Sequence, residues 1–151
     1  MLYLFPILAI LIAAIQIIFF DKPIIETLLA NILFFWIGFG GIFAFVGHTF
    51  KSDEVAEKIG WEKGNPFQHE VGFANLGFGI AGIMSMWFRG EFWLAIIVSV
   101  SIFYIGAGIT HIIDIKKNSN KAEFNAGAPL YFDFIEPIIL ILLYILYSNN
   151  I

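Results

Sequence analysis

The sequence predicts an all-α integral membrane protein: one helical bundle with about five transmembrane helices and a cytoplasmic N-terminus. The 151 residues are 60% hydrophobic and only 13% charged, whereas a soluble domain is typically about 45–50% apolar and about 25% charged. The apolar residues gather in five runs, each near the roughly 20 residues that cross the hydrocarbon layer. The chain is too short for a second domain of ordinary size, so we expect residues 1–151 to form a single unit.

The five runs define the expected spans, which cover about residues 2–20, 24–50, 66–88, 92–115 and 130–147. The first run has no basic segment before it and no small-residue cleavage pattern after it, so we interpret it as a retained span and not a signal peptide. The second run is long enough to tilt. The tight turns Asp21-Lys22-Pro23 and Arg89-Gly90-Glu91 make the first and second spans, and the third and fourth, antiparallel neighbours.

Basic residues give the orientation, because cytoplasmic loops carry an excess of lysine and arginine. Only Lys22 and Arg89 lie on the side predicted to be external. The loops after the second and fourth spans hold six lysines: Lys51, Lys58, Lys63, Lys116, Lys117 and Lys121. We therefore expect a multi-pass protein of the cell membrane, with lipid as a partner and a homo-oligomer as a candidate assembly. The net charge of −4, without a basic block, argues against nucleic acid as a partner.

The loop before the third span contains signals for helix ends. Gly60 is placed to end a short helix in a left-handed conformation. Asn65 and Pro66 are typical of an N-cap and a first helical residue, and Gln68 is placed to close a capping box. Later in the chain, we expect the segment around Asn125 to fold back over the helix ends.

Ionisable residues in or near the apolar runs form the candidate metal site. Charged groups at such depths are expensive, on the order of 2.5–3.5 kcal/mol each, so a chain that keeps several is expected to use them. The candidate ligands are His48, His111, Asp114, Asp133 and Glu136. Two pairs among them are three residues apart on one helix face, as in four-helix di-metal proteins. Without cysteine, imidazole and carboxylate ligands suit a divalent zinc, iron or manganese ion.

Two alternatives to a metal stay open for these residues. The acids and histidines are also suited to a buried electrostatic lock between helix ends, or to solvation in the headgroup zone. A wider ligand pocket is predicted from Gln68, Glu70, Asn75, Asn125 and Tyr104. Glu70 and Asn75 point roughly 140° apart on one helix, which is a weakness of any pocket that contains both.

Glycine-rich stretches lie on the second and third spans, over residues 38–41 and 77–82. They are suited to a hinge or a lipid groove. Close helix packing is the favoured interpretation, because small residues let membrane helices approach each other.

These features favour a protein that binds a divalent metal or a small polar or lipid ligand at the cytoplasmic leaflet. One function of this kind is that of a membrane enzyme acting on a lipid head group. The chain has no nucleophile motif, phosphate loop or nucleotide fingerprint. One alternative is a proton- or ion-coupled transporter, for which the outer halves supply few polar residues: Gln16, Asn31, Ser85, Ser99 and Ser101. Another alternative is a structural subunit that binds a partner through its glycine faces.

The segment of residues 59–76 carries a resemblance to a known family. Its successive motifs are Ile59-Gly60-Trp61, then a segment from Gly64 through Pro66-Phe67-Gln68, then Glu70-Val71-Gly72. This order resembles a family of small, uncharacterised prokaryotic membrane proteins with a domain of unknown function. The resemblance implies a polytopic membrane protein whose core motif includes Pro66, Phe67, Gln68, Glu70 and Gly72. It implies no activity.

Overall fold

The computed structural model describes residues 3–149, which contain helices and turns and no strand. The chain starts with α1 (Leu4–Phe20) and continues into one unbroken rod made of α2 (Ile24–Asn31), the π-helix η1 (Ile32–Phe39) and α3 (Gly40–Phe50). The remaining elements are α4 (Ser52–Ile59), α5 (Phe67–Met84), α6 (Glu91–Asn118), α7 (Glu123–Ala126) and α8 (Ala128–Ser148). The all-α prediction is confirmed for this range.

Three helical segments are long and apolar enough to cross a membrane: residues 24–50, 91–118 and 123–148. The predicted spans over 2–20 and 66–88 correspond to α1 and α5, which are shorter or less apolar. Helix α1 has 17 residues, and the first turn of α5 contains the polar residues Gln68, His69 and Glu70 after Phe67. The count of five spans and the orientation therefore stay predictions.

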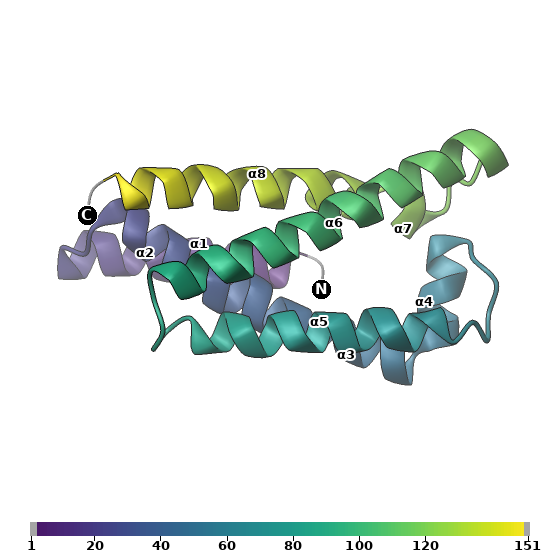
Figure 1. Cartoon of the computed structure of the whole chain (residues 1–151), viewed down its shortest axis with the longest axis horizontal. Coiled ribbons are helices and arrows are strands. Elements are labelled where there is room, and N and C mark those ends of the chain that lie inside the picture. Colours follow the sequence, from purple (N-terminus) through teal and green to yellow (C-terminus); the bar gives the residue numbers. More distant parts are fainter. Residues whose placement is uncertain (1–2, 150–151) are drawn as a thin grey trace.

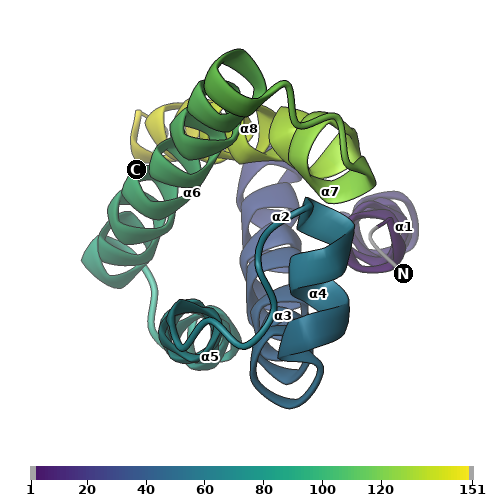
Figure 2. The same ribbon diagram turned by 90° about the vertical axis from the view of Figure 1, so that its right-hand side faces the viewer.

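The long helices run roughly along one axis, and the short ones gather at one end (Figure 1). We call this end, which carries α4 and α7, the cap end. The opposite end carries the α1–α2 turn, the α5–α6 turn and the end of α8, and we call it the turn end. Seen from the cap end, the rod of α2, η1 and α3 lies between α1 and α5, with α8 above it and α6 along the left side (Figure 2).

A dry core joins the rod to α6 and α8. It contains the fully buried side chains Leu33, Ile37, Trp93 and Leu140, among others. The indole Nε1 of Trp93 donates a hydrogen bond of 2.8 Å to the carbonyl oxygen of Ser85, so this large polar ring is satisfied within the core.

Glycines bring α5 against the rod at backbone distance. A Cβ added to Gly82 would lie 2.6 Å from the backbone nitrogen of Gly38, and one added to Gly41 would lie 2.7 Å from the carbonyl oxygen of Asn75. Atoms this close leave no room for a side chain. Close packing, the favoured interpretation of the glycine stretches, is confirmed.

The predicted signals around α5 are confirmed with one exception. Gly60 ends α4 with φ +79°. The Asn65 side chain accepts a hydrogen bond of 2.9 Å from the backbone N–H of Phe67 at the start of α5. The capping box is wrong, because the Gln68 side chain is directed to His48 of α3 instead. A partner on another helix replaces the local one.

Candidate functional site

The candidate site forms where the antiparallel helices α6 and α8 approach each other near the cap end (Figure 1). Gly108 of α6 permits this approach. A Cβ at Gly108 would lie 2.6 Å from a ring carbon of Phe134 and 3.1 Å from the Cβ of Asp133. Asp133 of α8 is thereby held against α6 beside Gly108, which lies one turn before His111 on that helix.

His111 has a different neighbour at each ring nitrogen. Its Nδ1 lies 2.7 Å from Oδ1 of Asn125, and its Nε2 lies 3.9 Å from Oδ2 of Asp133. Asn125 is fully buried, and its Nδ2 donates to the carbonyl oxygen of Asn120 at 2.9 Å. That bond fixes the orientation of the amide, so Oδ1 faces His111 as an acceptor and Nδ1 must carry the proton. In neutral imidazole, Nε2 then presents a lone pair to Asp133.

Among the described residues, the two buried acids of α8, Asp133 and Glu136, lack hydrogen-bond donors. Within residues 3–149, neither Oδ2 of Asp133 nor Oε1 of Glu136 has a hydrogen-bond partner, although both atoms are buried. Glu136 is only 4% exposed, and the phenol of Tyr104 lies within electrostatic reach of both carboxyl groups. We call His111, Asp133 and Glu136 the His111 cluster. It presents three buried acceptor atoms that are suited to bind a proton or a cation.

Residues from the α4–α5 connection and the α6–α8 connection cover this cluster. The indole of Trp61 stacks on the His111 ring, with centroids 5.7 Å apart and planes at 23°. Its Nε1 donates a hydrogen bond of 2.9 Å to Oδ2 of Asp114. The amides of Asn118 and Asn120 donate to the same carboxylate at 2.6 and 2.7 Å. Asp114 therefore ties the cover to α6 and is occupied by amide and indole donors.

The remaining predicted metal ligand lies at another interface. His48 of α3 pairs through Nδ1 with Oε1 of Gln68 on α5, at 2.6 Å. Residues 3–149 contain no group of three or more histidine, aspartate or glutamate side chains already gathered around one ion position. Of the five predicted ligands, His111 and Asp133 lie 3.9 Å apart, Glu136 lies one turn after Asp133 on α8, and the divalent metal stays a prediction.

The predicted ligand pocket is divided in the same way. Tyr104 and Asn125 belong to the surroundings of the His111 cluster, whereas Gln68 belongs with His48. Asn75 is buried, and its amide donates to the carbonyl oxygen of Val71 on its own helix at 2.9 Å. Glu70 is exposed. The opposed directions of Glu70 and Asn75 on the helix explain this separation.

Sequence reasoning missed two residues of the cover, Trp61 and Asn120. Tryptophan is common at the membrane–water interface, so its residue type alone does not place Trp61 over a histidine. Asn120 donates to the carbonyl oxygen of Ile59 at 2.9 Å, and a Cβ at Gly60 would lie 2.6 Å from its Oδ1. The glycine directly before Trp61 was the available signal, since it leaves space for this asparagine as well as ending α4.

Comparison with known proteins gives one match. A family model described as "Family of unknown function (DUF6790)" matches residues 1–150. No curated protein and no solved structure matches the chain. The expectation of an uncharacterised family is confirmed, and the match assigns no activity to any residue.

Proposed function

The chain belongs to this family of unknown function, and we propose that it is a multi-pass protein of the cell membrane that binds a small cation at the His111 cluster. The cation is a proton or a divalent metal ion. One observation carries the proposal: Nε2 of His111 faces Oδ2 of Asp133 at 3.9 Å, while Nδ1 is committed to Asn125.

Electrostatics supports a cation between these atoms. A lone pair on nitrogen and an ionised carboxylate repel each other, and a buried carboxylate without a donor is strongly destabilising. A proton on His111 or Asp133 relieves the contact between them. Glu136 has a second buried oxygen without a donor, so one divalent ion would compensate both acids at once.

The environment of His111 matches that of a metal-binding histidine. Such histidines usually donate the other ring N–H to a carbonyl or carboxylate oxygen, which fixes the tautomer. Asn125 supplies that oxygen at 2.7 Å. Zinc, iron and manganese accept one imidazole together with carboxylates, and Asp133 and Glu136 would complete the set after side-chain rotation.

A membrane location is supported by the three long apolar segments and by the exposed apolar side chains along α1, α6 and α8. Six lysines against two basic residues favour the cytoplasm for the cap end. The cation would then enter from the cytoplasmic side, beneath Trp61.

A proton-coupled carrier is the second candidate function. Ser101 lies three residues from Tyr104, on the same face of α6. It is buried, and its hydroxyl has no partner within residues 3–149. Helical serines commonly bond to a carbonyl oxygen of the preceding turn, as Ser99 does with Ala95. The unpaired hydroxyl extends the polar stripe beyond Glu136 toward the turn end.

Elemental analysis of the full chain, purified in detergent without chelator and with metal supplied, tests the metal. We expect near-stoichiometric zinc, iron or manganese in the natural protein. The metal should be absent from the His111→Ala and Glu136→Gln variants. His69→Ala is the matched control, since His69 is exposed on α5, and should keep the metal. Metal that persists in both cluster variants would place the ion elsewhere.

Infrared spectroscopy tests the proton if no metal is found. Protonated carboxyl groups absorb separately from carboxylates, and we expect a protonated band at neutral pH that is lost in Glu136→Gln or in Asp133→Asn. If the natural protein contains no metal and shows no protonated carboxyl band, the proposal is wrong.

A further inference from the structure

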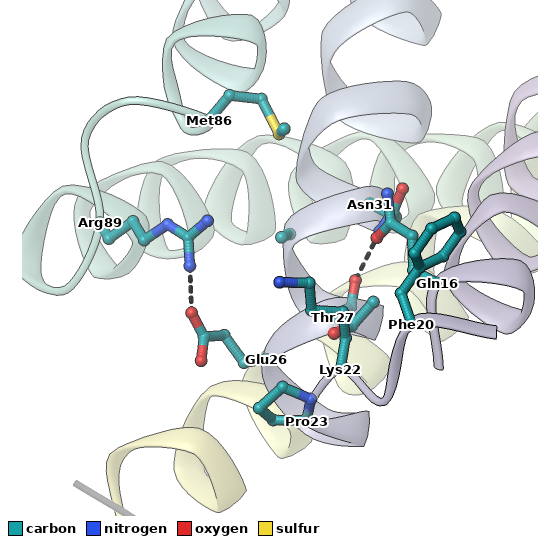
Figure 3. A pocket seen from close by; sticks show the side chains of 10 residues that line it. Gln16, Phe20, Lys22, Pro23, Glu26, Thr27, Asn31, Met86 and Arg89 are labelled. Atoms are coloured by element: carbon teal, nitrogen blue, oxygen red, sulfur yellow. Dashed lines mark hydrogen bonds and ion pairs between the residues drawn. The ribbon is translucent and has the colours of Figure 1, made fainter. Parts of the chain in front are cut away.

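A cavity of about 400 Å³ opens at the turn end, away from the His111 cluster (Figure 3). Its walls come from α1, the α1–α2 turn, α2 and the α5–α6 turn. The lining residues are Gln16, Phe20, Lys22, Pro23, Glu26, Thr27, Ala30, Asn31, Met86 and Arg89. Six of the ten lining residues have polar or charged side chains.

The inner wall is a built polar surface. Asn31 is 6% exposed, and its Nδ2 donates to Oε1 of Gln16 at 2.9 Å and to the carbonyl oxygen of Thr27 at 2.8 Å. Both amide hydrogens of Asn31 are thus used, and its Oδ1 is left as an acceptor. Since Oε1 of Gln16 is the accepting atom, Nε2 of Gln16 is left as a donor.

Thr27 adds a second buried polar group to the same wall. It is 7% exposed, and within residues 3–149 its hydroxyl has no hydrogen-bond partner. Its oxygen is not one of the fully buried atoms without a partner, so it is open to the cavity that Thr27 lines. A hydroxyl and an amide oxygen that both line a cavity and lack protein partners indicate a ligand with its own polar groups.

Two cations stand at the mouth of the cavity. Arg89 forms an ion pair with Glu26 that connects the α5–α6 turn to α2 (Figure 3). Lys22 has no ion-pair partner within the described residues, and the cavity lining carries one more positive than negative charge. Arginine has five N–H donors, so Arg89 keeps donors for an anion beside Glu26.

Exposed aromatic side chains flank the mouth. Phe20 lines the cavity and is largely exposed, and Trp87 and Phe88 next to Met86 are 73% and 53% exposed. Tryptophan and other aromatic side chains at this height are typical of the membrane–water interface. A ligand here would meet a polar, positively charged wall on one side and an apolar surface on the other.

We propose that this cavity binds the head group of an anionic phospholipid from the leaflet at the turn end. The phosphate would accept from Lys22, Arg89 and Nε2 of Gln16. A head-group hydroxyl would reach Oδ1 of Asn31 and the hydroxyl of Thr27, and the acyl chains would lie along Phe20 and Met86. The excess positive charge selects the anionic lipid over a zwitterionic one, and the apolar flank favours a lipid over free phosphate.

Lipid binding to the full chain in detergent tests this assignment, with phosphatidylglycerol, phosphatidylcholine and inorganic phosphate as three separate probes in native mass spectrometry and thermal unfolding. We expect phosphatidylglycerol to bind and to raise the unfolding temperature more than either other probe. Lys22→Gln should weaken that binding about tenfold, and Thr27→Val about fivefold, as expected for one charged and one neutral hydrogen bond. Lys117→Gln is the matched control, because Lys117 is exposed at the cap end, and should change little.

Three results would overturn the proposal. Equal binding of phosphatidylglycerol and phosphatidylcholine would remove the role of the charge. If Lys22→Gln and Lys117→Gln weaken phosphatidylglycerol binding equally, the preference for this lipid comes from the general surface charge and not from the cavity. A thermal shift from inorganic phosphate as large as that from phosphatidylglycerol would exclude the lipid as the specific ligand.

Discussion

Two helix interfaces in this molecule rely on glycine for close approach, and they treat their histidines differently. At the α3–α5 interface, Gly41 and Gly79 bring backbones together, and His48 is paired with Gln68 at 2.6 Å. At the α6–α8 interface, Gly108 serves the same purpose, but one nitrogen of His111 faces a carboxylate at 3.9 Å. Close packing of these helices therefore requires no unpaired acid.

The difference concerns acids, since the hydroxyl of Thr49 at the α3–α5 interface is also buried without a partner within residues 3–149. The His48–Gln68 pair satisfies itself, as a buried polar group in a packing interface does. Asp133 and Glu136 each keep a buried oxygen without a donor, although apolar side chains would fill the same space at lower free energy. We infer that the α6–α8 interface keeps its acids for binding and the α3–α5 interface keeps its glycines for packing.

The largest expected effect is the loss of the glycine contact in Gly82→Ala. The new Cβ would lie 2.6 Å from the backbone nitrogen of Gly38 and 2.7 Å from the carbonyl oxygen of Leu33, and backbone atoms cannot rotate away. We expect the free energy of unfolding in mixed micelles to fall by about 3 kcal/mol. Gly77→Ala is the matched control on the same helix. It meets nothing within 4 Å, and alanine favours the helix by about 1 kcal/mol, so an equal loss in both variants would contradict the packing role.

The next largest effect is an increase in the free energy of unfolding, at the α6–α8 interface. Glu136→Leu replaces a buried carboxyl without a donor by an apolar side chain of similar volume. We expect the free energy of unfolding of the cation-free protein to rise by about 2 kcal/mol, while metal or proton uptake is lost. Glu123→Leu, at an exposed acid of α7, should leave uptake intact. A less stable Glu136→Leu protein would show that the carboxyl group holds the helices together.

The helix limits could be predicted because their signals are local. Asp21-Lys22-Pro23, Gly60 and Asn65 act on the residues beside them, and the predicted boundaries lie within a few residues of the observed ones. The π-helix η1 could not be predicted, because its sequence reads as an ordinary apolar run. Its wider backbone packs directly against Gly82 of another helix.

The sequence predicts residue types for a candidate site, but it does not predict how they are grouped. A spacing of three residues pairs His111 with Asp114 and Asp133 with Glu136, yet it contains no information on which helices face each other. The Gln68 side chain was expected to close a capping box on its own helix, but it contacts His48 on α3 instead. Trp61 suited lipid or protein equally well by composition, and only the position of α4 decides between them.

A smaller effect is expected from Asn125→Ala, which sharpens the comparison of the two histidines. The change leaves Nδ1 of His111 and the carbonyl oxygen of Asn120 without their buried partner, so the free energy of unfolding should fall by about 1.5 kcal/mol. Released from Asn125, the imidazole can adopt the other tautomer, and cation affinity should fall as well. Asn118→Ala removes an exposed bond to Asp114 and should change stability by less than about 0.5 kcal/mol. Unchanged cation affinity in Asn125→Ala would remove the tautomer from the explanation.

The smallest expected effect concerns the exposed ion pair between Lys63 and Glu57. Its paired carboxylate serves as the comparison for the unpaired acids buried between α6 and α8. The Lys63 ammonium donates a hydrogen bond of 2.9 Å to Glu57, and this bond lowers the pKa of the Glu57 carboxyl below its ordinary value. A carboxyl whose pKa is lower in the folded protein stabilises the fold above its unfolded pKa, and the contribution disappears as the pH falls through the folded pKa. Thermal unfolding of the natural protein and of Lys63→Gln between pH 7 and pH 3 should therefore show a small difference at pH 7 that vanishes in acid. Both side chains are exposed, so added salt should reduce the difference at pH 7. A difference that persists in acid or resists salt would mean that Lys63 acts through packing and not through its charge.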